Sequence, residues 1–186
     1  AAGEGDAFLV GGVESVSSVD MTPRSEDEPH PRLTGGEGAI CDAYIPMGMT
    51  AENVAERYDV AREEMDRFAQ RSQELAVAAV EQGLFAREIV PYTTAAGATV
   101  AADDGPRPSS TYEKLAALDP VFKEGGRVTA GNACPLNDGA AAALVVSDRL
   151  AAELGIETRA RVVATAAAAL EPEYMGVGPI EAVRTA

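Results

Sequence analysis

The stretch TAGNACPLNDGAAA, residues 129–142, marks the point at which a glycine-punctuated loop gives way to an apolar run. Residues 122–135 are interrupted by glycines, which predicts turns rather than a regular element. The apolar run 140–146 fits a buried strand. Residues 147–154 predict a short helix that Gly155 stops. The sequence therefore predicts a loop, a strand and a helix in succession.

Two further apolar runs predict strands, one near each end of the chain. Residues 7–13 include the pair Gly11 and Gly12 and read as a short buried strand. Residues 161–167 read as another buried strand, although their alanines fit a helix as well. Strands that alternate with helices predict an α/β fold with a mostly parallel sheet, which a mainly helical insertion interrupts.

The insertion is built around one long predicted helix. Apolar residues from Met65 to Val80 recur three and four positions apart, so they form one stripe on a helix that Gly83 ends. A shorter helix is predicted on each side of it, one capped by Thr50 and running to residue 58, the other capped by Ser110 and running to residue 118. The charged side chains of the long helix form a predicted solvated face, namely Arg62, Glu63, Arg67, Arg71, Glu74 and Glu81.

Composition and charge argue against several classes of protein. The chain has 186 residues, 46% of them hydrophobic, and a formal net charge of −15. Nucleic acids and anionic membrane surfaces carry phosphate, so a chain of this charge is not expected to bind either. No apolar run approaches the roughly 20 residues that cross a bilayer, and the first residues do not form a signal peptide. We therefore expect a cytoplasmic protein with no membrane or nucleic-acid partner.

The chain contains one histidine, His30, and two cysteines, Cys41 and Cys134. A single histidine excludes most histidine-rich metal sites, so we predict no metal site. The cysteines are far apart and no secretion signal accompanies them, so we do not expect a disulfide. A hydrolase nucleophile at Cys134 needs a base, and the only histidine lies far away in a proline-flanked loop. We expect Cys134 to be buried or to line a pocket.

Five segments, in order, resemble the thiolase family, which includes acetyl-CoA acetyltransferases and 3-ketoacyl-CoA thiolases. The opening stretch is similar to the family's TAGNAS-G-x-NDGAAA segment, and the other four cover most of the remaining chain. One such match is weak, but five in order are specific. The other four segments are GGVES at 11–15, MGMTAEN at 47–53, REEMDRFAQRSQ at 62–73 and MGVGP at 175–179.

The resemblance implies the thiolase fold and acyl transfer between coenzyme A thioesters, by 3-ketoacyl-CoA cleavage or Claisen condensation, as in fatty acid metabolism and β-oxidation. Coenzyme A is then a substrate or product, with no permanently bound cofactor. The family's chemistry uses a cysteine nucleophile, a histidine that activates it, a second cysteine and an oxyanion hole. The motifs that carry these groups have no counterpart in the chain, and His30 lacks the family context, so no catalytic residue is predicted here.

Two hypotheses of different class remain open. In the first, the chain is an internal fragment of a catalytic thiolase, and the isolated fragment is inactive. In the second, it belongs to a noncatalytic thiolase-like protein that binds acyl-CoA or a partner subunit. A cysteine at a helix start just upstream of Ala1 would favour the first hypothesis.

The resemblance also implies domains, partners and site residues. We expect a homodimer or homotetramer that acts on acyl-CoA. The implied divisions are the end of the first core half at 1–19, a loop domain over coenzyme A at 20–135, a return to that half at 136–157 and the start of the second half at 158–186. The residues implied to contact coenzyme A or shape the acyl tunnel are Met47, Arg107, Leu118, Phe122, Ala130, Gly131, Cys134 and Met175.

Three positions depart from the family pattern. Pro46 replaces a histidine, and Pro135 replaces a glycine and should stiffen its loop. Cys134 replaces the serine that donates a hydrogen bond to the pantetheine arm, and a thiol donates more weakly than a hydroxyl. We therefore expect an acyl tunnel that differs from that of an acetoacetyl-CoA-specific thiolase.

Overall fold

The computed structural model describes residues 3–19 and 28–186 and divides the chain into two compact units. Unit 1 comprises Ala1–Glu28, Leu136–Ala168 and Ile180–Ala186, and unit 2 comprises Pro29–Pro135 and Ala169–Pro179. The start of the predicted loop domain, residues 20–27, lies outside the described residues. The implied core halves and loop domain stay a prediction.

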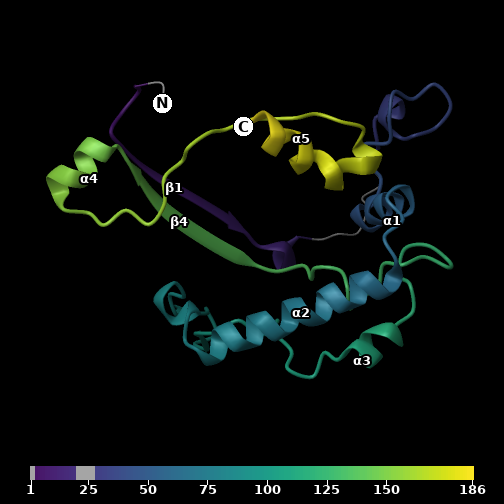
Figure 1. The fold of residues 1–186 in the computed structure, drawn as a ribbon, viewed down its shortest axis with the longest axis horizontal. Coiled ribbons are helices and arrows are strands. Elements are labelled where there is room, and N and C mark those ends of the chain that lie inside the picture. Colours follow the sequence, from purple (N-terminus) through teal and green to yellow (C-terminus); the bar gives the residue numbers. More distant parts are fainter. Residues whose placement is uncertain (1–2, 20–27) are drawn as a thin grey trace. The chain divides into compact units, whose positions relative to one another are not determined.

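Each unit has its own set of elements, and Figure 1 labels the α-helices and the two long strands, β1 and β4. Unit 1 contains β1 (Ala7–Glu14), a 3-10 turn (Val16–Ser18), β4 (Gly139–Val146), α4 (Asp148–Leu154) and most of α5 (Gly178–Thr185). Unit 2 contains α1 (Met47–Arg57), α2 (Arg62–Glu81), α3 (Tyr112–Ala116), the short strands β2 (Tyr92–Thr93) and β3 (Thr99–Val100), and 3-10 turns at Pro31–Leu33, Phe85–Arg87 and Pro172–Val177.

The sheet of unit 1 is a two-stranded antiparallel ribbon. β1 pairs with β4 along its whole length, from Ala7 opposite Val146 to Glu14 opposite Gly139. β2 and β3 in unit 2 also pair antiparallel, so the expected parallel pairing is absent from the described residues. The expectation that both long strands are buried is wrong as well. Every residue of β1 is exposed, because neither α4 nor α5 packs extensively on the ribbon.

The helix after β4 forms as predicted, and the strand expected after it does not. The Ser147 side chain caps α4 by accepting a hydrogen bond from the Leu150 N–H (3.2 Å), and Gly155 ends the helix at a φ of 64°. Residues 161–167 have no regular structure. Val162 and Val163 there are 72% and 88% exposed, since no described strand pairs with this segment.

Two helices of unit 2 begin at residues other than the predicted ones. α1 begins at Met47 rather than after Thr50, and the Thr50 hydroxyl donates to the Met47 carbonyl (2.7 Å) instead of capping the helix. α3 is capped by Thr111, the neighbour of the predicted Ser110, and ends at Ala116. Adjacent hydroxyl residues offer equivalent caps, so the sequence does not decide between them.

The long helix α2 forms as predicted, and Gly83 follows its end at a φ of 68°. Its apolar stripe, however, is not buried, since Phe68 and Leu75 are 70% and 55% exposed. The buried residue of α2 is instead Asp66, at 1% exposure. Arg62 is also not a solvated charge, because it pairs with Asp66 (2.7 Å), which corrects the prediction for this residue.

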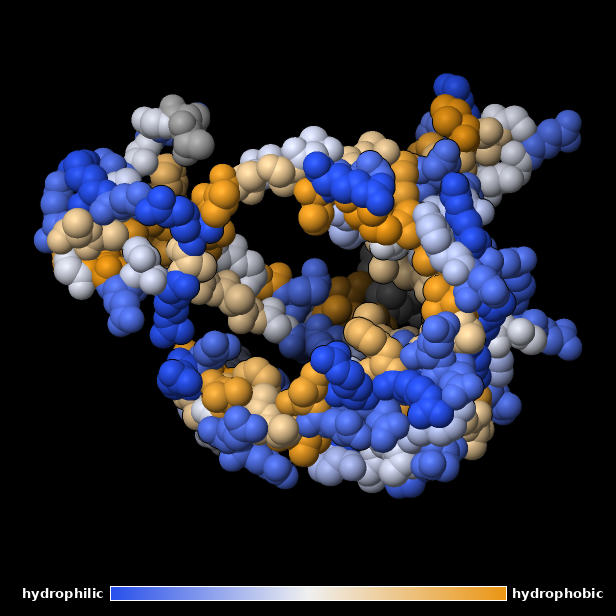
Figure 2. Space-filling view, viewed as in Figure 1, coloured by the Kyte–Doolittle hydropathy of each residue, from blue (hydrophilic) through white to orange (hydrophobic). Residues whose placement is uncertain are grey.

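The buried residues of unit 2 are as much polar as apolar. Many apolar side chains reach the surface (Figure 2), and few are enclosed. The residues buried in this unit are Thr50, Glu52, Ala55, Asp66, Leu115, Val128 and Thr129.

Of the helices in the described ranges, none combines the length and apolar content needed to cross a bilayer.

Candidate functional site

All eight residues predicted to contact the substrate lie in unit 2, and contacts and pocket linings place most of them in two clusters. One cluster surrounds the start of α1. The other lies where the loop after residue 128 meets the end of α3. We call them the α1 cluster, comprising Met47, Phe122 and Met175, and the loop cluster, comprising Leu118, Ala130 and Gly131.

The α1 cluster borders an open apolar groove. Met47 and Met175 both line this groove, which has a volume of about 320 Å³. Val54 and Met65 contribute further apolar surface. A groove of this size and lining suits an apolar chain, because ligand pockets are mostly apolar and begin at about 300 Å³.

Polar contacts hold Met175 beside α1 although the two lie far apart in sequence. The Asn53 amide donates to the carbonyl of Glu173 (3.2 Å), and the Arg57 guanidinium lies 4.5 Å from the centre of the Tyr174 ring. The Glu173 carboxylate accepts a hydrogen bond from the Asp42 N–H (3.0 Å). Bonds from its own N–H and from that of Asp42 lower the pKa of Glu173. The 3-10 turn that carries Met175 is thereby fixed against α1.

Phe122 joins the α1 cluster through a close approach to Gly48. A Cβ added at Gly48 would lie 2.2 Å from a ring carbon of Phe122. Only glycine leaves room for the ring there. The ring therefore packs directly against the first turn of α1, next to Met47, and remains 42% exposed.

The loop cluster forms around Gly131. A Cβ at this position would lie 2.6 Å from side-chain carbons of both Leu115 and Leu118, so the two leucines pack on the bare backbone. Ala130 beside it is exposed. The end of α3 and the loop thus bring Leu118, Ala130 and Gly131 together.

Cys134 is exposed, so the expectation of a buried thiol is wrong, and its place beside the pantetheine arm stays a prediction. The turn that buries Thr129 ends at Ala133, whose N–H donates to the Thr129 carbonyl (3.1 Å). The chain is exposed again from Cys134, and Leu136 is 75% exposed. Cys41 and Cys134 are both free thiols.

Arg107 lies apart from both clusters. Its N–H donates to the Gln73 side chain on α2 (2.7 Å), which anchors its loop. The residue itself is exposed. Within residues 3–19 and 28–186, its guanidinium forms neither a salt bridge nor a hydrogen bond.

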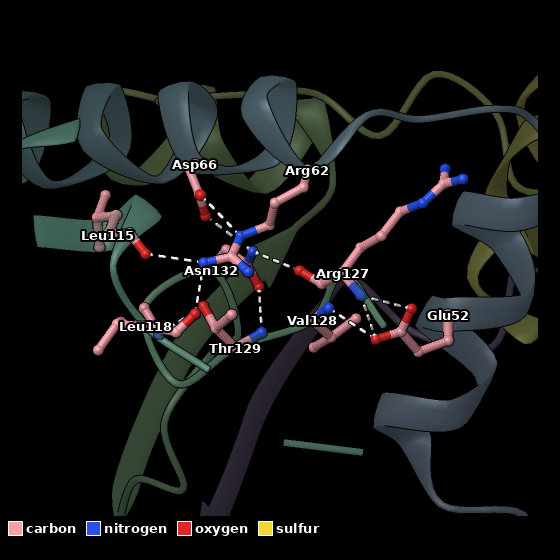
Figure 3. A network of polar contacts seen from close by, with 10 residues as sticks. Glu52, Arg62, Asp66, Leu115, Leu118, Arg127, Val128, Thr129 and Asn132 are labelled. Atoms are coloured by element: carbon pink, nitrogen blue, oxygen red, sulfur yellow. Dashed lines mark hydrogen bonds and ion pairs between the residues drawn. The ribbon is translucent and has the colours of Figure 1, made fainter. Parts of the chain in front are cut away.

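A buried polar network supports the loop cluster, and sequence reasoning did not identify it (Figure 3). On one side, the Glu52 carboxylate, 3% exposed, accepts hydrogen bonds from the N–H groups of Arg127 (2.8 Å) and Val128 (2.7 Å). The Arg127 guanidinium donates to the carbonyls of Ala55 (2.9 Å) and Val60 (2.6 Å). These contacts attach the segment before Thr129 to α1.

On the other side of the network, Asp66 is the common partner. One of its oxygens accepts from Arg62 (2.7 Å), and the other accepts from the Asn132 amide (3.0 Å). The Asn132 side chain also accepts from the Thr129 N–H (2.8 Å) and donates to the Arg127 carbonyl (3.0 Å). Glu52 and Val128 are 76 positions apart, and Asp66 and Asn132 are 66 apart, so no local sequence pattern reveals these pairs.

The described parts of the chain hold no group of three or more His, Cys, Asp or Glu side chains that could bind a metal ion. They do provide an apolar groove and a rigidly supported loop. The groove can accept the apolar part of a ligand.

Comparisons with known proteins agree on one family. The family model described as "Thiolase, N-terminal domain" matches residues 1–149. The chain is 39% identical to an acetyl-CoA acetyltransferase of Pseudomonas aeruginosa, over 99% of this chain and 50% of that protein. It is 41% identical to a 3-ketoacyl-CoA thiolase of Pseudoalteromonas translucida, over 99% of this chain and 47% of that protein.

A solved structure gives the same result. The dimeric peroxisomal thiolase of Saccharomyces cerevisiae is 35% identical, with a TM-score of 0.82 over 97% of this chain and 46% of that one. The chain spans about half the length of the curated relatives that it matches.

Proposed function

The chain belongs to the thiolase family, and from this premise we propose that the protein of which it forms part transfers acyl groups between coenzyme A thioesters. The prediction that the chain has part of the α/β thiolase fold is confirmed by its likeness to solved thiolases. The relatives are thiolases that differ in their named activities, acetyl-CoA acetyltransferase and 3-ketoacyl-CoA thiolase. The direction of the reaction and the acyl chain length are therefore left to experiment.

The α1 cluster is the observation that carries this proposal. Met47 and Met175 lie 128 positions apart in the sequence, and both border one apolar groove. An acyl chain or the pantetheine arm of coenzyme A is the part of the substrate that such a groove suits. Phe122 packs beside it on Gly48 and would contribute an aromatic wall.

The loop cluster and Arg107 would contact the remainder of coenzyme A. Leu118 and Ala130 are exposed and lie beside the half-buried Gly131, so together they would offer a close-packed surface. Arg107 would contact the adenine end, where its guanidinium can stack on the ring and bind phosphate. Cys134 would reach the pantetheine arm, and its exposure makes it accessible. In this scheme the nucleophile, the base and the second cysteine come from parts of the protein outside the chain.

We further propose that the whole protein is a homodimer or homotetramer located in the cytoplasm. The solved yeast relative is named as dimeric, which supports association. Its peroxisomal origin shows that thiolases occupy more than one compartment. The compartment is testable by localising the tagged full-length protein.

The test is an assay of 3-ketoacyl-CoA cleavage by the full-length protein, with free coenzyme A as the second substrate. We expect turnover by that protein and none by the 186-residue chain, whose only histidine caps a short 3-10 turn at Pro31–Leu33. Coenzyme A binding without turnover by the full-length protein would instead establish the noncatalytic alternative. Neither binding nor turnover would refute the proposal.

A further inference from the structure

We propose that Asp66 is a positioning residue for coenzyme A, which sets the relative placement of the two segments that form the loop cluster. This inference rests on the proposed function, because it takes the loop cluster to be a coenzyme A surface. Asp66 itself is 1% exposed and cannot touch a ligand. It acts through Arg62 and Asn132, which its two oxygens bind separately.

The first segment is the end of α3. The Arg62 guanidinium, held by Asp66 at 2.7 Å, donates to the carbonyls of Leu115 and Leu118, each at 2.9 Å. These carbonyls belong to the two leucines whose side chains pack on Gly131. Arg62 therefore fixes the backbone from which one face of the loop cluster projects (Figure 3).

The second segment is the loop that contains Ala130 and Gly131. Asn132 donates to Asp66 (3.0 Å) and accepts from the Thr129 N–H (2.8 Å), and so closes the turn across these two residues. The Gly131 N–H donates to the Thr129 hydroxyl (3.2 Å). The amide of Asn132 thus holds the loop in one conformation, and Asp66 holds that amide.

One carboxylate therefore joins two separate segments, the end of α3 and the loop that contains Ala130 and Gly131. A buried ion pair contributes little net stability, because the loss of hydration offsets most of the attraction. Its attested use is to select one geometry among alternatives. At Asp66 that geometry is the packing of the Leu115 and Leu118 side chains on the backbone of Gly131. Gly131 has no side chain that could change rotamer to compensate for a shift of the leucines.

The consequence is a defect that depends on the substrate. Loss of Asp66 should disturb the surface for coenzyme A. It should leave the acyl groove intact, because the residues that line the groove, from α1, the Pro172–Val177 turn, Val60 and Met65, are not among the hydrogen-bond partners of the Asp66 carboxylate, which are Arg62 and Asn132. A thioester of N-acetylcysteamine lacks the nucleotide and much of the pantetheine arm. Its turnover should therefore be insensitive to the disturbance, whereas an acyl-CoA should bind more weakly.

The experiment compares Asp66→Asn with Glu63→Gln in the full-length protein. Glu63 lies on the same helix and forms an (i, i+4) pair with Arg67, but that pair is exposed and, among the described residues, Glu63 makes no side-chain hydrogen bond to Leu115, Leu118 or Asn132. We expect Asp66→Asn to raise KM for the 3-ketoacyl-CoA about ten-fold. We expect kcat, and kcat/KM for the N-acetylcysteamine thioester, to stay within about two-fold of the values for Glu63→Gln.

Asn132→Ala provides a second variant, because it leaves the Arg62–Asp66 pair in place and frees only the loop. It should show the same substrate-dependent defect, and it decides the question if Asp66→Asn does not fold. Equal losses with both thioesters, or no loss relative to Glu63→Gln, would overturn the inference while the proposed function stands. A wild-type protein with no activity on either thioester would overturn the proposed function instead.

Discussion

At the scale of single residues, Arg107 is the cation that we propose as the contact for a phosphate of coenzyme A. The chain carries a net charge of −15, so its overall field repels an anionic ligand and binding must depend on local positive groups. Arg107 is exposed, and its loop is anchored to Gln73 on α2. An anchored backbone, with a guanidinium that has no partner among residues 3–19 and 28–186, is suited to a charge-assisted contact.

Arg107→Ala in the full-length protein should therefore weaken coenzyme A binding by about 1–2 kcal/mol, as the loss of one exposed charge-assisted contact predicts. The change should fall on KM rather than kcat, because the adenine end is remote from the reacting carbons. It should shrink as salt is added. Steady-state kinetics at two ionic strengths measure KM and kcat of Arg107→Ala and of the wild type, and so give the salt dependence of the difference.

Arg71→Ala is the matched control for Arg107→Ala. Arg71 is an exposed arginine on α2, and its removal changes the net charge by the same amount. If both variants raise KM equally, Arg107 acts only through the general field. An unchanged KM for Arg107→Ala at low salt contradicts the specific contact.

Gly48 is a residue at which a single methyl group should disturb the site. Alanine normally favours a helix over glycine by up to about 1 kcal/mol. Here its Cβ would lie 2.2 Å from the Phe122 ring, so the ring has to move. We expect Gly48→Ala to destabilise the full-length protein by about 1–2 kcal/mol and to raise KM. Thermal unfolding and steady-state kinetics measure the two effects.

Removing the ring should restore stability. In the double variant Gly48→Ala with Phe122→Ala, the clash is absent, so the two changes should not add. Gly36→Ala is the matched control, because its Cβ would meet only the Thr34 hydroxyl at 3.8 Å. If Gly48→Ala behaves like Gly36→Ala, the close approach of the ring has no energetic consequence.

The residue scale also shows what the sequence could and could not predict. Met47, Met175 and Gly131 were identified by resemblance, and the structure places each beside a groove or a close contact. Asp66 and Glu52 lie inside the resembling segments, but the sequence predicts no role for either residue. Asn132 lies 66 positions from Asp66, and Val128 lies 76 positions from Glu52, separations at which charge patterning along one helix carries no information.

At the scale of elements, local rules succeeded where the element is stabilised locally. The end of α2 at Gly83 and both caps of α4 follow from backbone and side-chain chemistry within one turn. Strand burial and strand direction depend on which segments pair. The local rules therefore predicted buried, parallel strands where the structure has an exposed, antiparallel pair. The run 161–167 is apolar enough for a strand but finds no partner among the described residues.

One carboxylate links the two long strands beyond their ladder. The Ser17 N–H donates to Asp138 (2.9 Å), and the Ser17 hydroxyl donates to its other oxygen. Ser17 follows β1 and Asp138 precedes β4, so the contact closes the open end of the ribbon. The Ser17 hydroxyl and then the Ser17 N–H lower the pKa of Asp138 below the ordinary value of 3.8.

The sign of the pH dependence follows from this direction. A folded-state pKa below the unfolded value means that the contact stabilises the fold above pH 3.8 and that this stabilisation is lost as the pH falls through the lowered pKa. Asp138→Asn should therefore lower the melting temperature of the full-length protein at neutral pH. The difference from wild type should shrink as the pH falls below 3.8 and through the lowered pKa of Asp138.

Two comparisons separate this contact from a general charge effect. Glu157→Gln removes an exposed carboxylate of unit 1 that has no hydrogen-bond or salt-bridge partner among the described residues, and it should leave the melting temperature unchanged. Ser17→Ala should mimic Asp138→Asn, and the double variant should be no worse than either single one. Additive losses would show that the two side chains act independently.

At the scale of the whole molecule, the exposed apolar surface of the chain has a consequence for its association. Leu9 and Val13 on β1 are 83% and 79% exposed, and Leu144 on β4 is 57% exposed. Each strand has one partner in the ribbon and leaves an edge unpaired in the described residues. Unpaired edges that carry apolar side chains promote association between copies.

We therefore expect the isolated 186-residue chain to self-associate, and the full-length protein to form a defined dimer or tetramer. Size-exclusion chromatography with light scattering distinguishes the two outcomes. Val13→Lys in the isolated chain should reduce association, because a charged side chain on an edge strand opposes strand addition. Val90→Lys is the matched control, since Val90 is similarly exposed, at 83% against 79% for Val13, but lies outside the strands. A monodisperse monomer that unfolds cooperatively would contradict the expectation, because the exposed ribbon would then be stable in water without a partner.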